Sequence, residues 1–216
     1  MRGVSVKSEY GPTLTELLVP RFRSLAPAYR RLLLGAMGGL AVGVVALGVL
    51  WPRAHHFSHS GSVSFNLKYS PSFQRMPAQP GGLLKVVQAH EGKLVQSFAV
   101  ALVRLGPHRG DPSAELPVFA GGYIRRLAAQ HDGFLLLSEG KTSVFTYPGY
   151  AILYRAREAG QTVYGRDDLL VPDVPRRRDG VALSMLATPA SGPADPSKVG
   201  ATGPLSDILR SFSFGS

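Results

Sequence analysis

The sequence predicts an α+β fold, an antiparallel sheet with helices packed on it, preceded by one transmembrane helix. Three observations lead to this prediction: an apolar run at residues 32–51, later segments in which apolar and polar side chains alternate, and two segments with apolar residues at helical spacing. The expected organisation is a basic cytoplasmic tail (1–31), the transmembrane helix (32–51), a linker (52–61) and an extracytoplasmic domain (62–216).

The apolar run reads LLLGAMGGLAVGVVALGVLW and contains no charged side chain. As a helix it would be roughly 30 Å long, which matches the hydrocarbon thickness of a bilayer. We interpret it as a retained signal anchor. The alternative is a cleaved signal peptide, whose apolar region is usually shorter and ends at an A-x-A-like site. Basic residues concentrate before the run, so the positive-inside rule predicts a cell-membrane protein with its N-terminus in the cytoplasm and its C-terminal domain outside.

Small residues recur along one face of this predicted helix. Gly35, Gly39 and Gly43 are spaced four residues apart, which allows two helix backbones to approach closely. This spacing favours helix pairing, either in a homodimer or with another membrane subunit. The alternative is that glycine is simply frequent in bacterial membrane helices. The excess of Arg over Lys, with abundant Ala, Gly and Pro, is typical of bacterial proteins encoded by GC-rich genomes.

Short strands account for most of the predicted domain. Residues 62–69 (SVSFNLKY) alternate strictly between apolar and polar side chains, as in a half-buried strand. Two further strands, joined by a tight turn at Glu91–Lys93, are expected at 83–90 and 95–105. The remaining predicted strands cover residues 134–140, 142–148, 150–157, 162–171 and 179–189.

Two helices are predicted to pack on the sheet. Pro117 suits the first turn of a helix over 117–130, with Phe119, Tyr123 and Leu127 on one face. A shorter helix over 204–210 begins near the end of the chain, and its apolar stripe should dock on the sheet. That stripe consists of Leu205, Ile208, Leu209 and Phe212.

The two ends of the domain carry motifs that resemble the PsbP-like fold family, which includes photosystem II extrinsic subunits and Ran-binding Mog proteins. SFNLKYSP (64–71) is similar to the opening strand of that family, and LRSFSF (209–214) is similar to its close. An additional Ser70 separates Tyr69 from Pro71, which departs from the family pattern. The resemblance covers about residues 62–215. It implies a binding or assembly role, with no shared enzymatic activity and no site residue to carry over.

Residue types and spacing indicate no catalytic site. The chain has no cysteine, and no nucleotide-binding, zinc-protease or calcium-loop spacing occurs. Asp167 and Asp168 are the only adjacent carboxylates, and we interpret them as part of a solvated turn beside Arg166. His55, His56 and His59 suggest metal binding, but no carboxylate accompanies them, so no metal or cofactor is expected. The basic residues are too dispersed to predict nucleic-acid binding.

The densest basic cluster in the domain is Arg176, Arg177 and Arg178, a candidate contact for a partner. The alternative is an ordinary charged loop. The leading functional hypothesis is a membrane-anchored, extracytoplasmic binding domain without catalytic activity, acting on a protein partner in the cell envelope. Two alternatives stay open. One is an accessory subunit held through the glycine face. The other is an enzyme whose residues converge only in the fold, which a deep pocket lined by a histidine or by Asp167 and Asp168 would favour.

Overall fold

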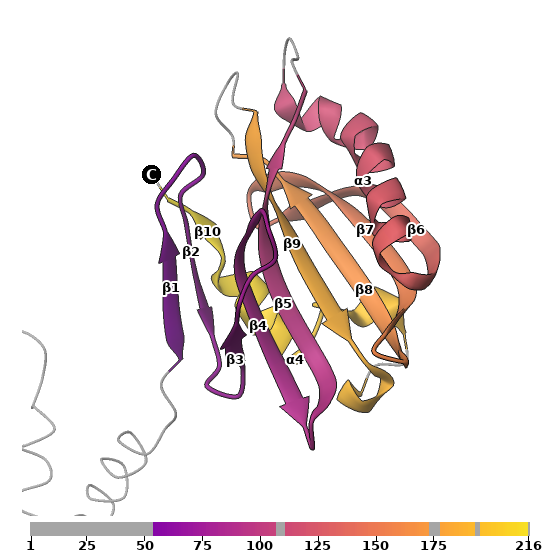
Figure 1. Cartoon of the computed structure of the whole chain (residues 1–216). Coiled ribbons are helices and arrows are strands. Elements are labelled where there is room, and N and C mark those ends of the chain that lie inside the picture. Colours follow the sequence, from indigo (N-terminus) through magenta and orange to yellow (C-terminus); the bar gives the residue numbers. More distant parts are fainter. Residues whose placement is uncertain (1–53, 107–110, 173–177, 193–194, 216) are drawn as a thin grey trace, which may run out of the picture. The chain divides into compact units, whose positions relative to one another are not determined.

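The domain is described by a computed structural model (Figure 1) that covers residues 54–106, 111–172, 178–192 and 195–215. The predicted membrane segment with Gly35, Gly39 and Gly43 lies outside these residues, as do Arg176 and Arg177. In the parts of the chain that are described, no helix is long and apolar enough to cross a membrane.

The main element is a seven-stranded antiparallel sheet. Its strands follow the spatial order β3 (Gln74–Met76), β4 (Gly82–His90), β5 (Lys93–Arg104), β9 (Asp179–Ala187), β8 (Gln161–Leu170), β7 (Tyr147–Glu158) and β6 (Asp132–Val144). Most neighbouring strands are also consecutive in the sequence and form hairpins, and the β5–β9 pair joins the two halves of the sheet.

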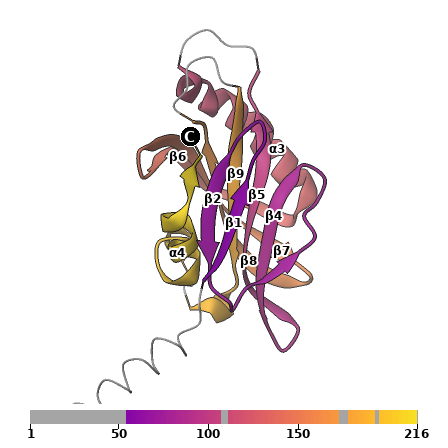
Figure 2. The same ribbon diagram turned by 90° about the vertical axis from the view of Figure 1, so that its left-hand side faces the viewer.

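Each face of this sheet is covered by a separate layer (Figures 1 and 2). Helix α3 (Leu116–Gln130), which follows the 3-10 turn η1 (Pro112–Glu115), packs on β6 and β7. The opposite face is covered by α4 (Gly203–Ser211) and a three-stranded sheet. That sheet contains β1 (His55–His59), β2 (Phe65–Tyr69) and β10 (Ser213–Phe214), and the turns η2 (Pro189–Ser191) and η3 (Pro196–Lys198) lie before α4.

The alternation and the helical stripe predicted from the sequence explain the core beneath α4. Phe65 and Leu67 of β2 are buried, whereas their neighbour Lys68 is exposed. From α4, Ile208 and the following Phe212 are also buried, and the Phe65 and Phe212 rings stack with centroids 5.7 Å apart. The fold is therefore an α+β arrangement of antiparallel sheets with two helices, as predicted.

The segment LRSFSF (209–214) also contributes hydrogen bonds through Ser211. The backbone N–H of Lys68 donates to the Ser211 hydroxyl (2.8 Å), which lies 3.0 Å from the Lys68 carbonyl oxygen and 2.7 Å from that of Ile208. This side chain therefore joins the end of α4 to β2, where the chain continues as β10 along the same strand.

Three local predictions are wrong. Residues expected within a linker (52–61) include β1, whose five residues pair in register with β2. The predicted break between 134–140 and 142–148 does not exist, because β6 runs continuously to Val144 and the hairpin turns at Phe145 (φ 53°). No strand is predicted between 62–69 and 83–90, yet this segment contains β3, which pairs with β4.

Candidate functional site

Helix α3 covers only part of its face of the sheet, which leaves a groove over the strands beyond it. Strand register places four side chains of this face in one row across the sheet: Lys85 (β4), Ala99 (β5), Ser184 (β9) and Asp167 (β8). Ala99 and Ser184 are small, so the middle of the row is low between the longer side chains at its two ends.

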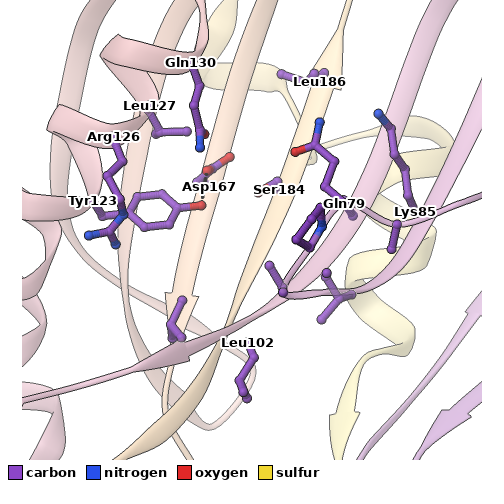
Figure 3. A pocket seen from close by; sticks show the side chains of 18 of the residues that line it. Gln79, Lys85, Leu102, Tyr123, Arg126, Leu127, Gln130, Asp167, Ser184 and Leu186 are labelled. Atoms are coloured by element: carbon purple, nitrogen blue, oxygen red, sulfur yellow. Dashed lines mark hydrogen bonds between the residues drawn. The ribbon is translucent and has the colours of Figure 1, made fainter.

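The groove has a volume of about 460 Å³. Residues of α3 form one wall, notably Phe119, Tyr123 and Gln130. The segment 78–82 that leads into β4 forms the opposite wall, and Figure 3 shows Gln79 and Lys85 on this side, across from Tyr123 and Asp167. The walls thus come from segments far apart in the sequence.

Asp167 lies at the floor of the groove and is completely buried (0% exposed). The Tyr123 hydroxyl donates to its Oδ2 at 2.7 Å, and the Tyr154 hydroxyl donates to its Oδ1 at 3.4 Å. Burial raises the pKa of this carboxyl to about 7, against the opposing effect of hydrogen bonds from Tyr123, Ser184 and Tyr154. Burial, together with the nearby Asp167, also raises the pKa of both tyrosines well above the ordinary range.

Gly165 gives Tyr154 its position beside this carboxyl. The two residues face each other across β7 and β8, and a Cβ added at Gly165 would lie 2.2 Å from Cζ of the Tyr154 ring. The ring of His131, at the end of α3, lies against Tyr154 with centroids 5.8 Å apart. Its Nδ1 atom is 3.6 Å from Oε2 of Glu158 and has no hydrogen-bond partner among the described residues.

The mouth of the groove carries positive charge. Arg104, Arg126 and Lys85 line it, and both arginines are exposed. Arg104 pairs with Asp179 (2.9 Å), whereas Lys85 and Arg126 form no ion pair within the described ranges. The Arg126 guanidinium instead lies 5.6 Å from the ring centroids of both Phe119 and Tyr123. The groove therefore has a buried acid at its floor and cations at its mouth.

The interpretation of Asp167 and Asp168 as part of a solvated turn is wrong, because both carboxylates are completely buried within β8. Alternation along the strand directs them to opposite faces. Asp168 is held by the Nε of Arg166, at 3.0 and 3.1 Å from its two oxygens. Burial raises the pKa of Asp168, and Arg166 opposes that effect.

The other sequence-derived candidates lie away from the groove or outside the described residues. Arg178 is exposed, and its carbonyl oxygen accepts from Leu105 N at 2.8 Å. His55 and His59 belong to β1, where their rings lie 5.3 and 5.4 Å from those of Tyr69 and Phe65. Across the described ranges, no cluster of three or more His, Cys, Asp or Glu is placed to hold a metal ion.

Comparisons with known proteins define the fold. No protein-family model and no curated protein matches the chain. Among solved structures, LpqN of Mycobacterium tuberculosis, involved in cell envelope biogenesis, is similar with a TM-score of 0.51 and 12% identity over 76% of this chain and 92% of LpqN. Cyanobacterial PsbP (CyanoP) from Synechocystis has a TM-score of 0.51 and 11% identity over 78% of this chain and 96% of CyanoP. The domain therefore has the fold of the PsbP-like family.

Proposed function

We propose that this chain is a single-pass membrane protein whose domain, outside the cytoplasm, binds a ligand in the groove beside α3. The observation that carries the proposal is a solvent-open groove whose floor holds a buried, hydrogen-bonded carboxyl group, Asp167. Sites for small ligands are concave and contain a few convergent polar groups among apolar ones. The apolar run at 32–51 and the basic residues before it support the membrane anchor and its orientation.

Filling the groove tests the binding function. Phe in place of Ala99 would project between Lys85 and Ser184, and Phe in place of the exposed Ala128 on α3 is the matched control. The full-length chain and both variants would be purified from membranes and analysed by native mass spectrometry. We expect a bound ligand on the wild type and the control, but not on Ala99→Phe. Absence of ligand from all three proteins, or its retention by Ala99→Phe, would contradict the proposal.

Membrane topology is tested separately with a reporter fused after Ser216. Accessibility of the reporter from outside intact cells is the expected result, and an inaccessible reporter would refute the orientation. We further propose that pairing through Gly35, Gly39 and Gly43 holds a second copy or another membrane subunit. Leucine at these positions should abolish co-purification of that subunit, and unchanged co-purification would exclude this role. The arginine cluster 176–178 is a second candidate contact for an envelope protein.

The second candidate function is an enzyme, and one observation favours it. Asp167, with its pKa raised to about 7, lies in a groove that His131 also lines, and general acids and bases are effective when their pKa is near the working pH. The two functions differ in what happens to the ligand. A binding protein releases it chemically unchanged, whereas an enzyme converts it at a rate that Asp167→Asn abolishes. Mass spectrometry of the ligand after incubation distinguishes them.

A further inference from the structure

The buried carboxyl of Asp167 has no cationic partner within the part of the chain that the structure describes. Its neighbours Tyr123, Tyr154 and Ser184 offer only hydroxyl groups. A carboxylate removed from water is unfavourable unless it is paired with a positive charge. Asp168, its neighbour on the other face, has such a partner in Arg166. Asp167 has no accessible surface in the free protein, so a ligand cation can pair with it only when a side chain that covers it, such as Tyr123 on Oδ2, moves aside.

Aromatic rings surround the same position. Tyr123 and Tyr154 both reach Asp167 through their hydroxyls, and Phe119 lies next to Tyr123, with ring centroids 6.2 Å apart. The Arg126 guanidinium already lies against the Phe119 and Tyr123 rings, so the charge partner for a protonated amine at this position is the Asp167 carboxylate itself.

The cations at the mouth of the groove favour a negative charge at the other end of the ligand. Lys85 and Asp167 end the row of four side chains, and three strand spacings of about 4.8 Å place their Cα atoms roughly 14 Å apart. Lys85 and Arg126 both line the groove, Lys85 from β4 and Arg126 from the α3 wall. An anionic group a few carbon atoms from the amine would lie near these cations.

We propose that the groove binds a small zwitterion, with a protonated amine on Asp167 and an anionic group toward Lys85 and Arg126. This rests on the proposed function, in which the groove is the binding site. The same chemistry occurs in free amino-acid-like solutes and in the headgroups of aminophospholipids, and the two sources are distinguished below.

The affinity for such a ligand should depend on pH. In the free protein, burial raises the pKa of Asp167 to about 7. The groups facing it are the hydroxyls of Tyr123, Tyr154 and Ser184, Asp168 adds its negative charge from the next position, and Arg126 and His131 line the same groove. Because an ammonium group requires the ionised carboxylate, each pH unit below 7 should weaken binding about tenfold. Above 7 the affinity should level off.

The test uses calorimetric titration of the full-length chain, held in amphipol, with 5-aminopentanoate. Pentylamine and pentanoate serve as the analogues that lack one charge. We expect the zwitterion to bind at least about tenfold more tightly than either analogue. Asp167→Asn should abolish binding of both amines. Arg126→Ala should weaken 5-aminopentanoate but not pentylamine, and Arg125→Ala, on the exposed side of α3, is the control.

Vesicles identify the source of the natural ligand. Displacement of 5-aminopentanoate by phosphatidylethanolamine vesicles, but not by phosphatidylcholine vesicles, would assign a lipid headgroup, and no displacement would assign a free solute. The inference is overturned if neither amine binds, or if Asp167→Asn binds as tightly as the wild type. Native mass spectrometry could also show that the wild type carries a ligand that has no amine and that Ala99→Phe does not carry it. This result would overturn the zwitterion inference but not the proposed function. Absence of any ligand there would overturn the proposed function as well.

Discussion

Replacing Asp167 with Asn should stabilise the domain at neutral and higher pH. Burial raises the pKa of this carboxyl from its ordinary value of 3.8 to about 7. Below about pH 4 the group is protonated in the folded and the unfolded chain, so it does not disfavour folding. As the pH rises toward 7, only the unfolded chain releases the proton, and stability is lost. At 1.36 kcal/mol for each pKa unit, the total loss is roughly 4 kcal/mol.

The asparagine amide cannot ionise, so Asp167→Asn should lack this loss. Urea unfolding of the full-length chain between pH 4 and pH 8 measures it. The variant and the wild type should have similar free energies of unfolding at pH 4, and the variant should exceed the wild type by up to about 4 kcal/mol at pH 8. Asp207→Asn, on the exposed side of α4, should follow the wild type. A gap that does not widen with pH, or a variant less stable at pH 8, would refute the reasoning.

Two further substitutions test the packing of Tyr154 beside the site and the hydrogen bond that Ser211 forms at the end of α4. Gly165→Ala should destabilise the domain by about 1–3 kcal/mol in thermal melts, because its Cβ would overlap the Tyr154 ring, whereas Gly140→Ala in β6 meets no atom within 4 Å and should have little effect. Equal effects would show that the ring does not lie over Gly165. Ser211→Ala should lose about 0.5–1.5 kcal/mol and speed hydrogen exchange at the Lys68 amide, which donates to that hydroxyl. Unchanged exchange at this amide would contradict the bond.

Local sequence patterns predicted the elements that bury one regular face. The strict alternation of β2 and the apolar stripe of α4 each identify an element and its buried side. The tight turn after β4 could also be predicted from the sequence, because it needs a residue such as Gly92 that adopts a positive φ (75°), beside Glu91 (φ 51°). Strand β1 could not be predicted, because its pairing with β2, and not an apolar pattern of its own, defines it.

The sequence named Asp167 and Asp168 only as the possible lining of a pocket in the enzyme alternative, because two adjacent aspartates usually lie in solvent. One signal was available: Asp167 and Asp168 are followed without a break by the apolar run Leu169, Leu170 and Val171, which is typical of a buried strand and not of a turn. Carboxylates within such a strand are either paired or placed in a cavity. The groove itself cannot be read from the sequence, because strand register alone aligns Lys85 with Asp167.

The most direct test of the groove as a binding site is site-specific photocrosslinking in intact cells. A photoreactive residue would replace Gln79, on the wall of the groove, or Arg125, on the outer side of α3. We predict a ligand adduct from position 79 that disappears when Ala99→Phe is added, and no such adduct from position 125. An absent adduct at position 79, or one that persists in the filled groove, would contradict the account.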